Sequence, residues 1–172
     1  MSTHTVYLVT CRNDAKQRAH FSIFIPQEAD PERGSLIEVI GAPMVGYRLE
    51  FRRAYRLADT PQRYTLVPLG LVQAQHMQYP PALEEGSDET VPKNDMERAA
   101  SAVPPPRISQ NFMAPVNDTT NQRCQEWTMA YVRRLVSLHY LEPEALQIVQ
   151  SHRDPPSHGI GLQPVGVGLG RA

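Results

Sequence analysis

The chain contains few of the features that identify specialised classes of protein. No apolar run approaches the roughly 20 residues that a membrane-spanning helix needs, so we expect no membrane span. The first residues lack the basic and apolar regions of a secretory signal. Among 172 residues there are only two cysteines, Cys11 and Cys124. Without a secretory signal, the sequence predicts two free thiols and a cytoplasmic location.

Neither sign of charge dominates the sequence. The chain has 17 lysines and arginines against 18 aspartates and glutamates, for a net charge of −1. Proteins that bind nucleic acid usually carry a basic surface, because phosphate contacts supply most of their affinity. We therefore expect a small-molecule or peptide substrate and no nucleic-acid partner, and the sequence leaves the oligomeric state open.

Motifs for cofactors and metals are also missing. The glycines at 166–170 have neither a strand before them nor a helix after them, so they do not predict a phosphate-binding loop. His152 and His158 flank Asp154, but their spacing matches no common metal site. We interpret this segment as an ordered turn, and we expect neither a cofactor nor a metal ion.

Apolar periodicity predicts a single α+β domain. Five β-branched or aromatic segments are typical of strands, at 5–11, 20–25, 35–40, 47–57 and 64–72. Pro68 either makes the last of them an edge strand or splits it, because proline lacks a backbone N–H. A stripe of apolar residues predicts a helix over 121–141, and a second helix follows at 143–151. We expect an antiparallel sheet of about five strands packed on the helix that carries Cys124.

Proline and glycine interrupt this pattern twice. The 16 prolines are too many for an ordinary compact domain, and they concentrate in an insertion at 79–121. A long loop of this kind is either functional or disordered, with room for one short helix at 96–102 capped by Asp95. The glycine-rich tail at 159–172 is aperiodic, with one candidate strand at 160–165.

Cys124 and His20 form the most specific pattern in the chain. Cys124 lies at the start of the predicted helix, after a polar run at 117–121, and His20 opens the second predicted strand. A helix N-terminus and a neighbouring imidazolium both favour thiolate over thiol. Cys124 is therefore a candidate nucleophile with His20 as its base. The alternative is that Cys124 is a small buried residue in the core.

Other polar residues are candidates for supporting roles. Glu38 interrupts an apolar strand, so it is either an exposed glutamate or the third catalytic residue, which orients His20. If its strand pairs antiparallel with that of His20, the two side chains lie side by side. Three more side chains are candidates for oxyanion or substrate binding: Tyr7, Gln125 and Trp127. A tyrosine on the first strand is, however, more often part of the core.

The order of these elements resembles that of a known group of enzymes. A strand that begins with histidine, HFSIFI at 20–25, is followed by GSLIEV at 34–39 and, much later, by a helix that begins CQEW at 124–127. This order is similar to that of circularly permuted papain-like families, such as the lecithin retinol acyltransferase-like proteins and the PPPDE peptidases. The resemblance covers about residues 5–45 and 119–140. It implies acyl transfer through a thioester, although Glu38 replaces the histidine common in the first group.

These observations lead to three hypotheses. The first is a cysteine-dependent acyl-transfer enzyme, that is, a hydrolase, acyltransferase or cyclase that acts on an amide or ester. The second is an isomerase or cyclase on the same scaffold that moves protons without a covalent intermediate. The third is a non-catalytic interaction module, in which the prolines at 104–106 bind a partner. The pair of Cys124 and His20 favours the first.

Overall fold

Five long antiparallel strands and a very short sixth form one sheet. The computed structural model describes residues 2–81, 83 and 88–160. The strands are β1 (Thr3–Cys11), β2 (His20–Pro26), β3 (Arg33–Ala42), β4 (Gly46–Arg56), β5 (Tyr64–Gln73) and β6 (Asp88–Glu89). Their order across the sheet is β5-β1-β2-β3-β4-β6, and every neighbouring pair is antiparallel. The α+β class and the five-stranded antiparallel sheet are therefore confirmed.

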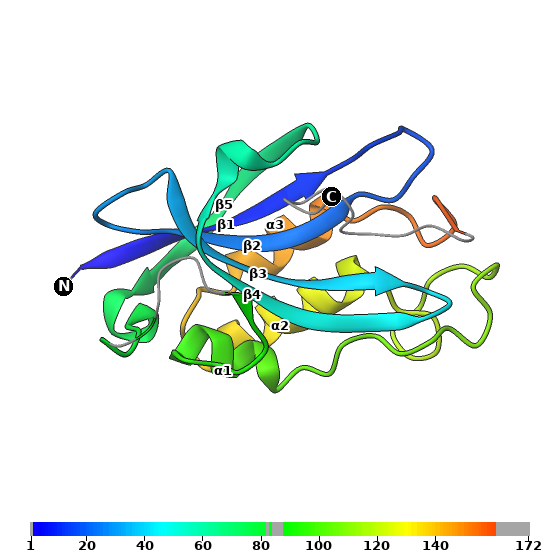
Figure 1. The fold of residues 1–172 in the computed structure, drawn as a ribbon. Helices are drawn as coiled ribbons and strands as arrows, with labels where there is room; N and C mark the ends of the chain where they lie inside the picture. The colour runs from blue at the N-terminus through cyan, green and yellow to red at the C-terminus, as the bar shows by residue number, and fades with distance from the viewer. Residues whose placement is uncertain (1, 82, 84–87, 161–172) are drawn as a thin grey trace.

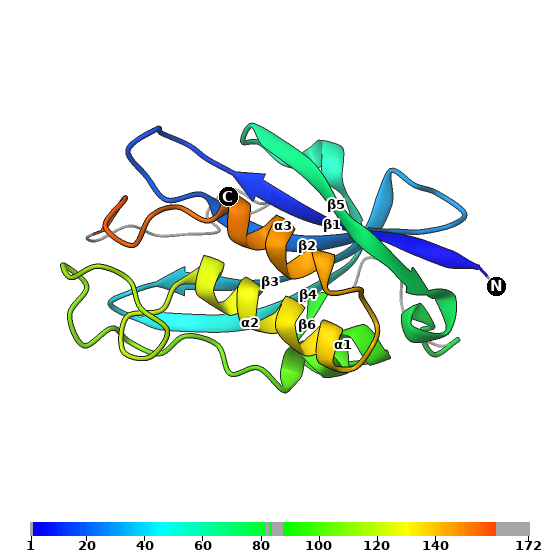
Figure 2. The same ribbon diagram turned by 180° about the vertical axis from the view of Figure 1, so that it is seen from behind.

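Helices cover one face of this sheet, as the two opposite views show (Figures 1 and 2). They are α1 (Asp95–Ser101), α2 (Cys124–Ser137) and α3 (Glu144–His152), and two 3-10 turns occupy Leu57–Asp59 and Ala74–Met77. Helix α2 packs against β2 and β3, while α3 packs against α2 and β5. None of the helices in the described residues has the length and apolar character needed to cross a bilayer.

Strand alternation separates the buried residues into two clusters. Odd-numbered residues of β2 and β3, such as Phe21, Ile23 and Ile37, pack with Trp127 of α2 in the main core. Even-numbered residues point to the other face, where Phe24 and Leu36 join a smaller cluster with residues of β1. His20 and Glu38 share this second alternation, but both lie beyond Ile23 and Ile37, the last backbone pair of β2 and β3 at this end.

Several sequence predictions differ from the structure at the ends of elements. Helix α2 begins at Cys124, three residues later than predicted, because Asn117 accepts backbone bonds from the residues at 119–121 and folds them into a turn of their own. It ends at Ser137 because His139 adopts a positive φ of 60°. The cap of α1 is Asn94, which accepts from the N–H of Glu97, and not Asp95.

Other predictions agree with the structure. β5 is an edge strand, as its Pro68 indicates. Helix α3 occupies the predicted position, shifted by one residue at each end. The strand predicted at 160–165 falls, apart from Ile160, outside the described residues.

The proline-rich insertion lies along the hairpin formed by β3 and β4. The N–H of Tyr47 donates to the Pro106 carbonyl at 2.9 Å, and the N–H of Ser109 donates to the Pro43 carbonyl at 2.8 Å. The turn between these strands depends on Gly46, whose φ of 81° favours glycine. The insertion is thus fixed to the sheet at the end where β3 meets β4.

A buried ion pair fixes the other end of the insertion. Glu97 of α1 is fully buried and accepts from Arg53 Nη2 at 2.6 Å, from Arg53 Nε at 3.1 Å and from the Tyr79 hydroxyl at 2.7 Å. Removing one partner of such a pair leaves the other buried and uncompensated. The pair therefore attaches α1 firmly to β4.

We predict that Glu97→Ala lowers the free energy of unfolding by about 3–5 kcal/mol, because it leaves Arg53 buried without its carboxylate. Urea denaturation followed by circular dichroism measures this change. The control is Arg98→Ala, which removes a pair with Asp95 whose arginine is 56% exposed, and here we expect less than about 1 kcal/mol. Equal effects of the two substitutions would contradict the assignment.

Candidate active site at the start of helix α2

The site is built around the first residue of α2. Cys124 begins the helix, and the Glu126 carboxylate accepts from the backbone N–H of Arg123 at 2.9 Å and so closes the helix start. The first N–H groups of a helix lack partners within it, and together with the helix dipole they favour negative charge. Cys124 thus occupies the end of the helix where a negative charge is most favourable.

β2 and β3 separate where the site is formed. Their backbone pairing includes Ile23 and Ile37 but does not continue towards His20, although β3 extends to Ala42. The start of α2 lies behind this separation (Figure 1). The Cys124 sulfur lies 3.8 Å from the carbonyl oxygen of Ala19, the residue before His20. The start of α2 therefore contacts the start of β2 at this point.

His20 and Glu38 form a buried pair. Their side chains are 4% and 0% exposed, and His20 Nε2 lies 2.7 Å from Glu38 Oε1. The antiparallel pairing of β2 and β3 brings them together, as predicted. The alternative of a solvent-exposed Glu38 is wrong. Arg52 Nε lies 3.9 Å from the other oxygen of Glu38 and adds positive charge beside the pair.

The ring of His20 presents its second nitrogen to the rest of the site. Nδ1 is buried and makes no hydrogen bond within the described residues, since Glu38 binds Nε2. Burial alone would lower the pKa of His20, but the negative charge and close contact of the Cys124 sulfur, with the Glu38 carboxylate, raise it to about 10. The imidazole is thus held between a carboxylate and a sulfur.

The other predicted site residues lie elsewhere or are already bonded. Gln125 is buried and donates to the Ala19 carbonyl at 2.9 Å and to Asp154 at 2.8 Å. Trp127 donates to the Val103 carbonyl at 2.9 Å and packs in the core. Tyr7 pairs with Phe24, four residues along β1 from the pair of Cys11 and His20. The structure does not bring Tyr7 to Cys124.

Asp154 is a site neighbour that the sequence did not reveal. The predicted turn is present, but its aspartate accepts from Arg12 at 2.7 Å, from the N–H of Ala19 at 2.9 Å and from Gln125. Burial would raise the pKa of Asp154, but these hydrogen bonds hold it below its usual value. Asp154 contacts Arg12, Ala19 and Gln125 only because the fold brings distant segments of the chain together. The spacing of residues in the sequence could not predict these contacts.

The segment after α3 closes the site from solvent. Arg18 is buried and donates to the carbonyls of Pro155 and His158 and to the carboxylate of Glu126. Arg123 donates to the carbonyl of Gly159 at 2.9 Å. These contacts hold residues 153–159 over the loop before β2, and the Cys124 side chain is only 1% exposed. The Cys124 sulfur is therefore buried in this closed arrangement.

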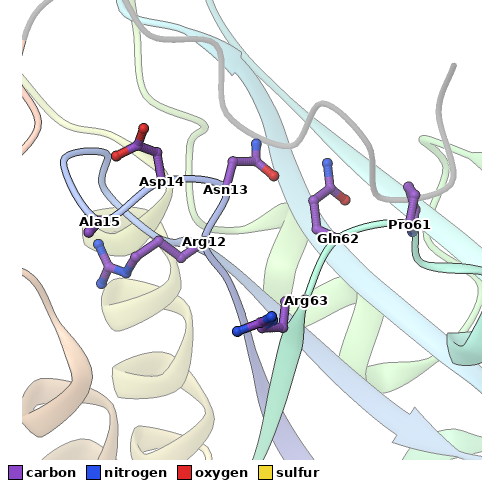
Figure 3. Close-up of a pocket in the computed structure, with 7 residues that line it drawn as sticks. All are labelled: Arg12, Asn13, Asp14, Ala15, Pro61, Gln62 and Arg63. Carbon is purple, nitrogen blue, oxygen red and sulfur yellow. The ribbon is translucent and has the colours of Figure 1, made fainter.

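A surface hollow lies beside this closed region. It has a volume of about 600 Å³ and is formed by residues 12–15 of the β1–β2 loop and residues 61–63 before β5 (Figure 3). Arg12 lines the hollow and bonds Asp154, which in turn bonds Gln125 next to Cys124. Two hydrogen bonds, through Asp154, thus connect Arg12 in the hollow with Gln125, the residue after Cys124.

Comparison with known proteins places the chain in a family. The model of a family of unknown function, DUF6540, matches residues 6–142. The chain belongs to this family. No curated protein and no solved structure matches it. The DUF6540 match includes His20, Glu38 and Cys124 and ends before Asp154. The function of the family is unknown, so membership in it names no activity.

We predict that the His20 ring stays protonated through neutral pH and titrates near pH 10 in the folded protein. NMR of the ring protons against pH measures this directly. An unperturbed histidine titrates at about 6.5, so protonation of His20 stabilises the fold. That contribution is complete below about pH 6.5 and is lost as the pH rises through about 10.

The matched variant for this titration is Cys124→Ala, which removes the negative charge beside the ring. The pKa of His20 should then move down, because burial is no longer opposed by the sulfur. A ring that titrates near the ordinary histidine value in the natural protein, or one that is unaffected by Cys124→Ala, would contradict the described pairing.

We also predict that Asp154→Ala speeds alkylation of Cys124 by about 10-fold, because a hydrogen bond to a charged group contributes about 1.5–3 kcal/mol to holding the segment closed. Iodoacetamide labelling located by peptide mapping measures the rate. The control is Asp118→Ala, since Asp118 is 81% exposed and lies 3.8 Å from Arg153. Unchanged labelling in Asp154→Ala would show that opening occurs elsewhere.

Proposed function

We propose that this DUF6540 protein is a cysteine-dependent acyl-transfer enzyme with a circularly permuted papain-like arrangement. Cys124 is the nucleophile, His20 the general base and acid, and Glu38 the residue that orients His20. One observation carries the proposal: a fully buried carboxylate binds one nitrogen of a buried imidazole at 2.7 Å, and that imidazole interacts with the cysteine at a helix start.

The cost of burying these groups supports a catalytic role. A carboxylate and an imidazole lose hydration inside a protein, and an apolar pair of similar size is often as stable there. Perturbed ionisable groups cluster at functional sites, although structural networks also perturb them. The pair between His20 and Glu38 differs from the structural pair between Arg53 and Glu97, because among the described residues His20 Nδ1 has no hydrogen-bond partner.

The chemistry follows from these positions. The Cys124 thiolate attacks a carbonyl carbon, a carbon–sulfur bond forms, and the electron pair of the carbonyl moves to its oxygen. When this intermediate collapses, the bond to the leaving group breaks and the His20 imidazolium gives that group its proton. Glu38 holds the ring in the required orientation throughout. The products are a thioester on Cys124 and a protonated amine or alcohol.

The second half of the reaction decides the type of enzyme. Water, another alcohol or amine, or a group within the same substrate attacks the thioester, and His20 takes its proton. Hydrolysis, transacylation and cyclisation therefore share one acyl-enzyme. We propose a small-molecule or peptide substrate, and the hydrogen bonds of residues 153–159 imply that access requires a local opening.

The test is the rate of iodoacetamide alkylation of Cys124 against pH, in a Cys11→Ala background. We expect alkylation to persist below about pH 8.5, where a free cysteine is mostly a thiol, and to fall about 100-fold at neutral pH in His20→Ala. Cys11 is a poor competitor in any case, because burial and the neighbouring charges of Glu38 and Cys124 raise its pKa to about 12.

Acylation by p-nitrophenyl acetate completes the test. A thioester at Cys124, seen by mass spectrometry in the natural protein and absent from Cys124→Ser and His20→Ala, is the expected result. Glu38→Gln should slow acylation without abolishing it, since it keeps the shape of the side chain. Alkylation with the pH dependence of a free thiol in every variant would overturn the proposal and leave Cys124 as a core residue.

A further inference from the structure

Tyr47 reaches the same site from a different strand. It is the second residue of β4, opposite Gly41 of β3. Tyr47, Leu49 and Phe51 alternate along β4 towards the helices, and all three pack in the main core that contains Cys124. Tyr47 therefore lies on the α2 side of the sheet, at the end where the hairpin of β3 and β4 turns.

The hydroxyl of Tyr47 is an unused hydrogen-bond donor. It is buried and has no hydrogen-bond partner within the described residues. Buried tyrosine hydroxyls usually find a partner, so an unsatisfied one requires an explanation. Burial and the negative charge of Cys124 raise the pKa of Tyr47, which keeps the hydroxyl protonated and able to donate. Its charged neighbours are Arg18, Arg123 and Glu126.

The other side of Tyr47 meets a surface hollow. This hollow has a volume of about 550 Å³ and is lined by residues 45–47 of the hairpin and residues 105–108 of the insertion. The bond from the Tyr47 N–H to the Pro106 carbonyl fixes the tyrosine at its wall. Tyr47 thus connects a space open to solvent with the buried end of α2.

We propose that Tyr47 is a further catalytic residue, whose hydroxyl donates to the carbonyl oxygen of the substrate while Cys124 attacks the carbonyl carbon. Once the site has opened, the carbonyl enters from the side of the hollow between the hairpin and the insertion. The carbonyl electron pair moves to oxygen, and the Tyr47 O–H hydrogen bond stabilises that charge without giving up its proton. This inference rests on the proposed function and adds a residue to it.

The other candidates for this donor are less suitable. The Gln125 side chain already donates to Ala19 and Asp154 and accepts from the N–H of Asp154. Tyr7 lies further along β1, opposite Phe24. The first backbone N–H groups of a helix have no partner within the helix, and the Tyr47 hydroxyl complements such donors.

Two reactions of Cys124 separate the role of Tyr47 from that of the thiolate. Alkylation by iodoacetamide displaces iodide and develops no oxyanion, whereas acetylation by p-nitrophenyl acetate passes through a tetrahedral oxyanion. We expect Tyr47→Phe to slow acetylation by about 100-fold, as loss of one oxyanion donor does elsewhere. Alkylation should stay within about twofold of the natural rate, because sulfur and His20 are unchanged.

Tyr55→Phe is the matched control. It also removes one hydroxyl from β4, and that hydroxyl bonds to Thr60 at 2.8 Å. We expect both reactions to proceed normally in this variant. Circular dichroism of both variants should show an unchanged fold, since tyrosine and phenylalanine have nearly the same shape.

The outcomes distinguish this inference from the proposed function. If Tyr47→Phe leaves acetylation unchanged while the natural protein acetylates Cys124 rapidly, the role of Tyr47 is overturned and the proposed function stands. If Tyr47→Phe slows both reactions equally, Tyr47 acts on the sulfur and the inference is again overturned. If the natural protein shows no activated thiol in either reaction, the proposed function fails and the inference fails with it.

Discussion

The site depends on the bond between His20 and Glu38. These residues come from two neighbouring strands, and each belongs to a strand whose other buried positions are almost wholly apolar. Their side chains meet because β2 and β3 are antiparallel neighbours, and both residues lie just beyond the last backbone pair, Ile23 and Ile37. The carboxylate fixes the ring, the ring faces the sulfur, and the helix start favours negative charge there.

Closure of the site is a separate feature of the structure. A network of buried arginines and carboxylates joins the loop before β2, the start of α2 and the segment after α3, with Arg18, Glu126 and Asp154 at its centre. Charged groups removed from water need partners, and in the closed arrangement both terminal nitrogens of Arg18 and the carboxylate of Asp154 have them. The Cys124 sulfur is buried while this segment is closed, so the proposed chemistry depends on movement of the segment.

The sequence predicted the elements and the central pair but not the surroundings. The alternation of side chains predicted the strands, and the short connection between β2 and β3 predicted the antiparallel pairing that brings Glu38 to His20. Both predictions depend on local patterns in the sequence. Asn94 capped α1 in place of Asp95, a difference of one residue that propensity does not resolve. Arg18, Tyr47 and Asp154 could not be found in this way, because they meet Cys124 and its neighbours only through long-range packing.

The proposed function requires a thiolate at Cys124 paired with the His20 imidazolium. A thiolate absorbs ultraviolet light that a thiol does not, and this absorbance needs no reagent to enter the closed site. At neutral pH we expect the natural protein to absorb more than Cys124→Ala at the thiolate wavelength. In His20→Ala this extra absorbance should be lost. The proposal would be contradicted if the thiolate absorbance of Cys124 appeared only at alkaline pH, and to the same extent in the natural protein and in His20→Ala.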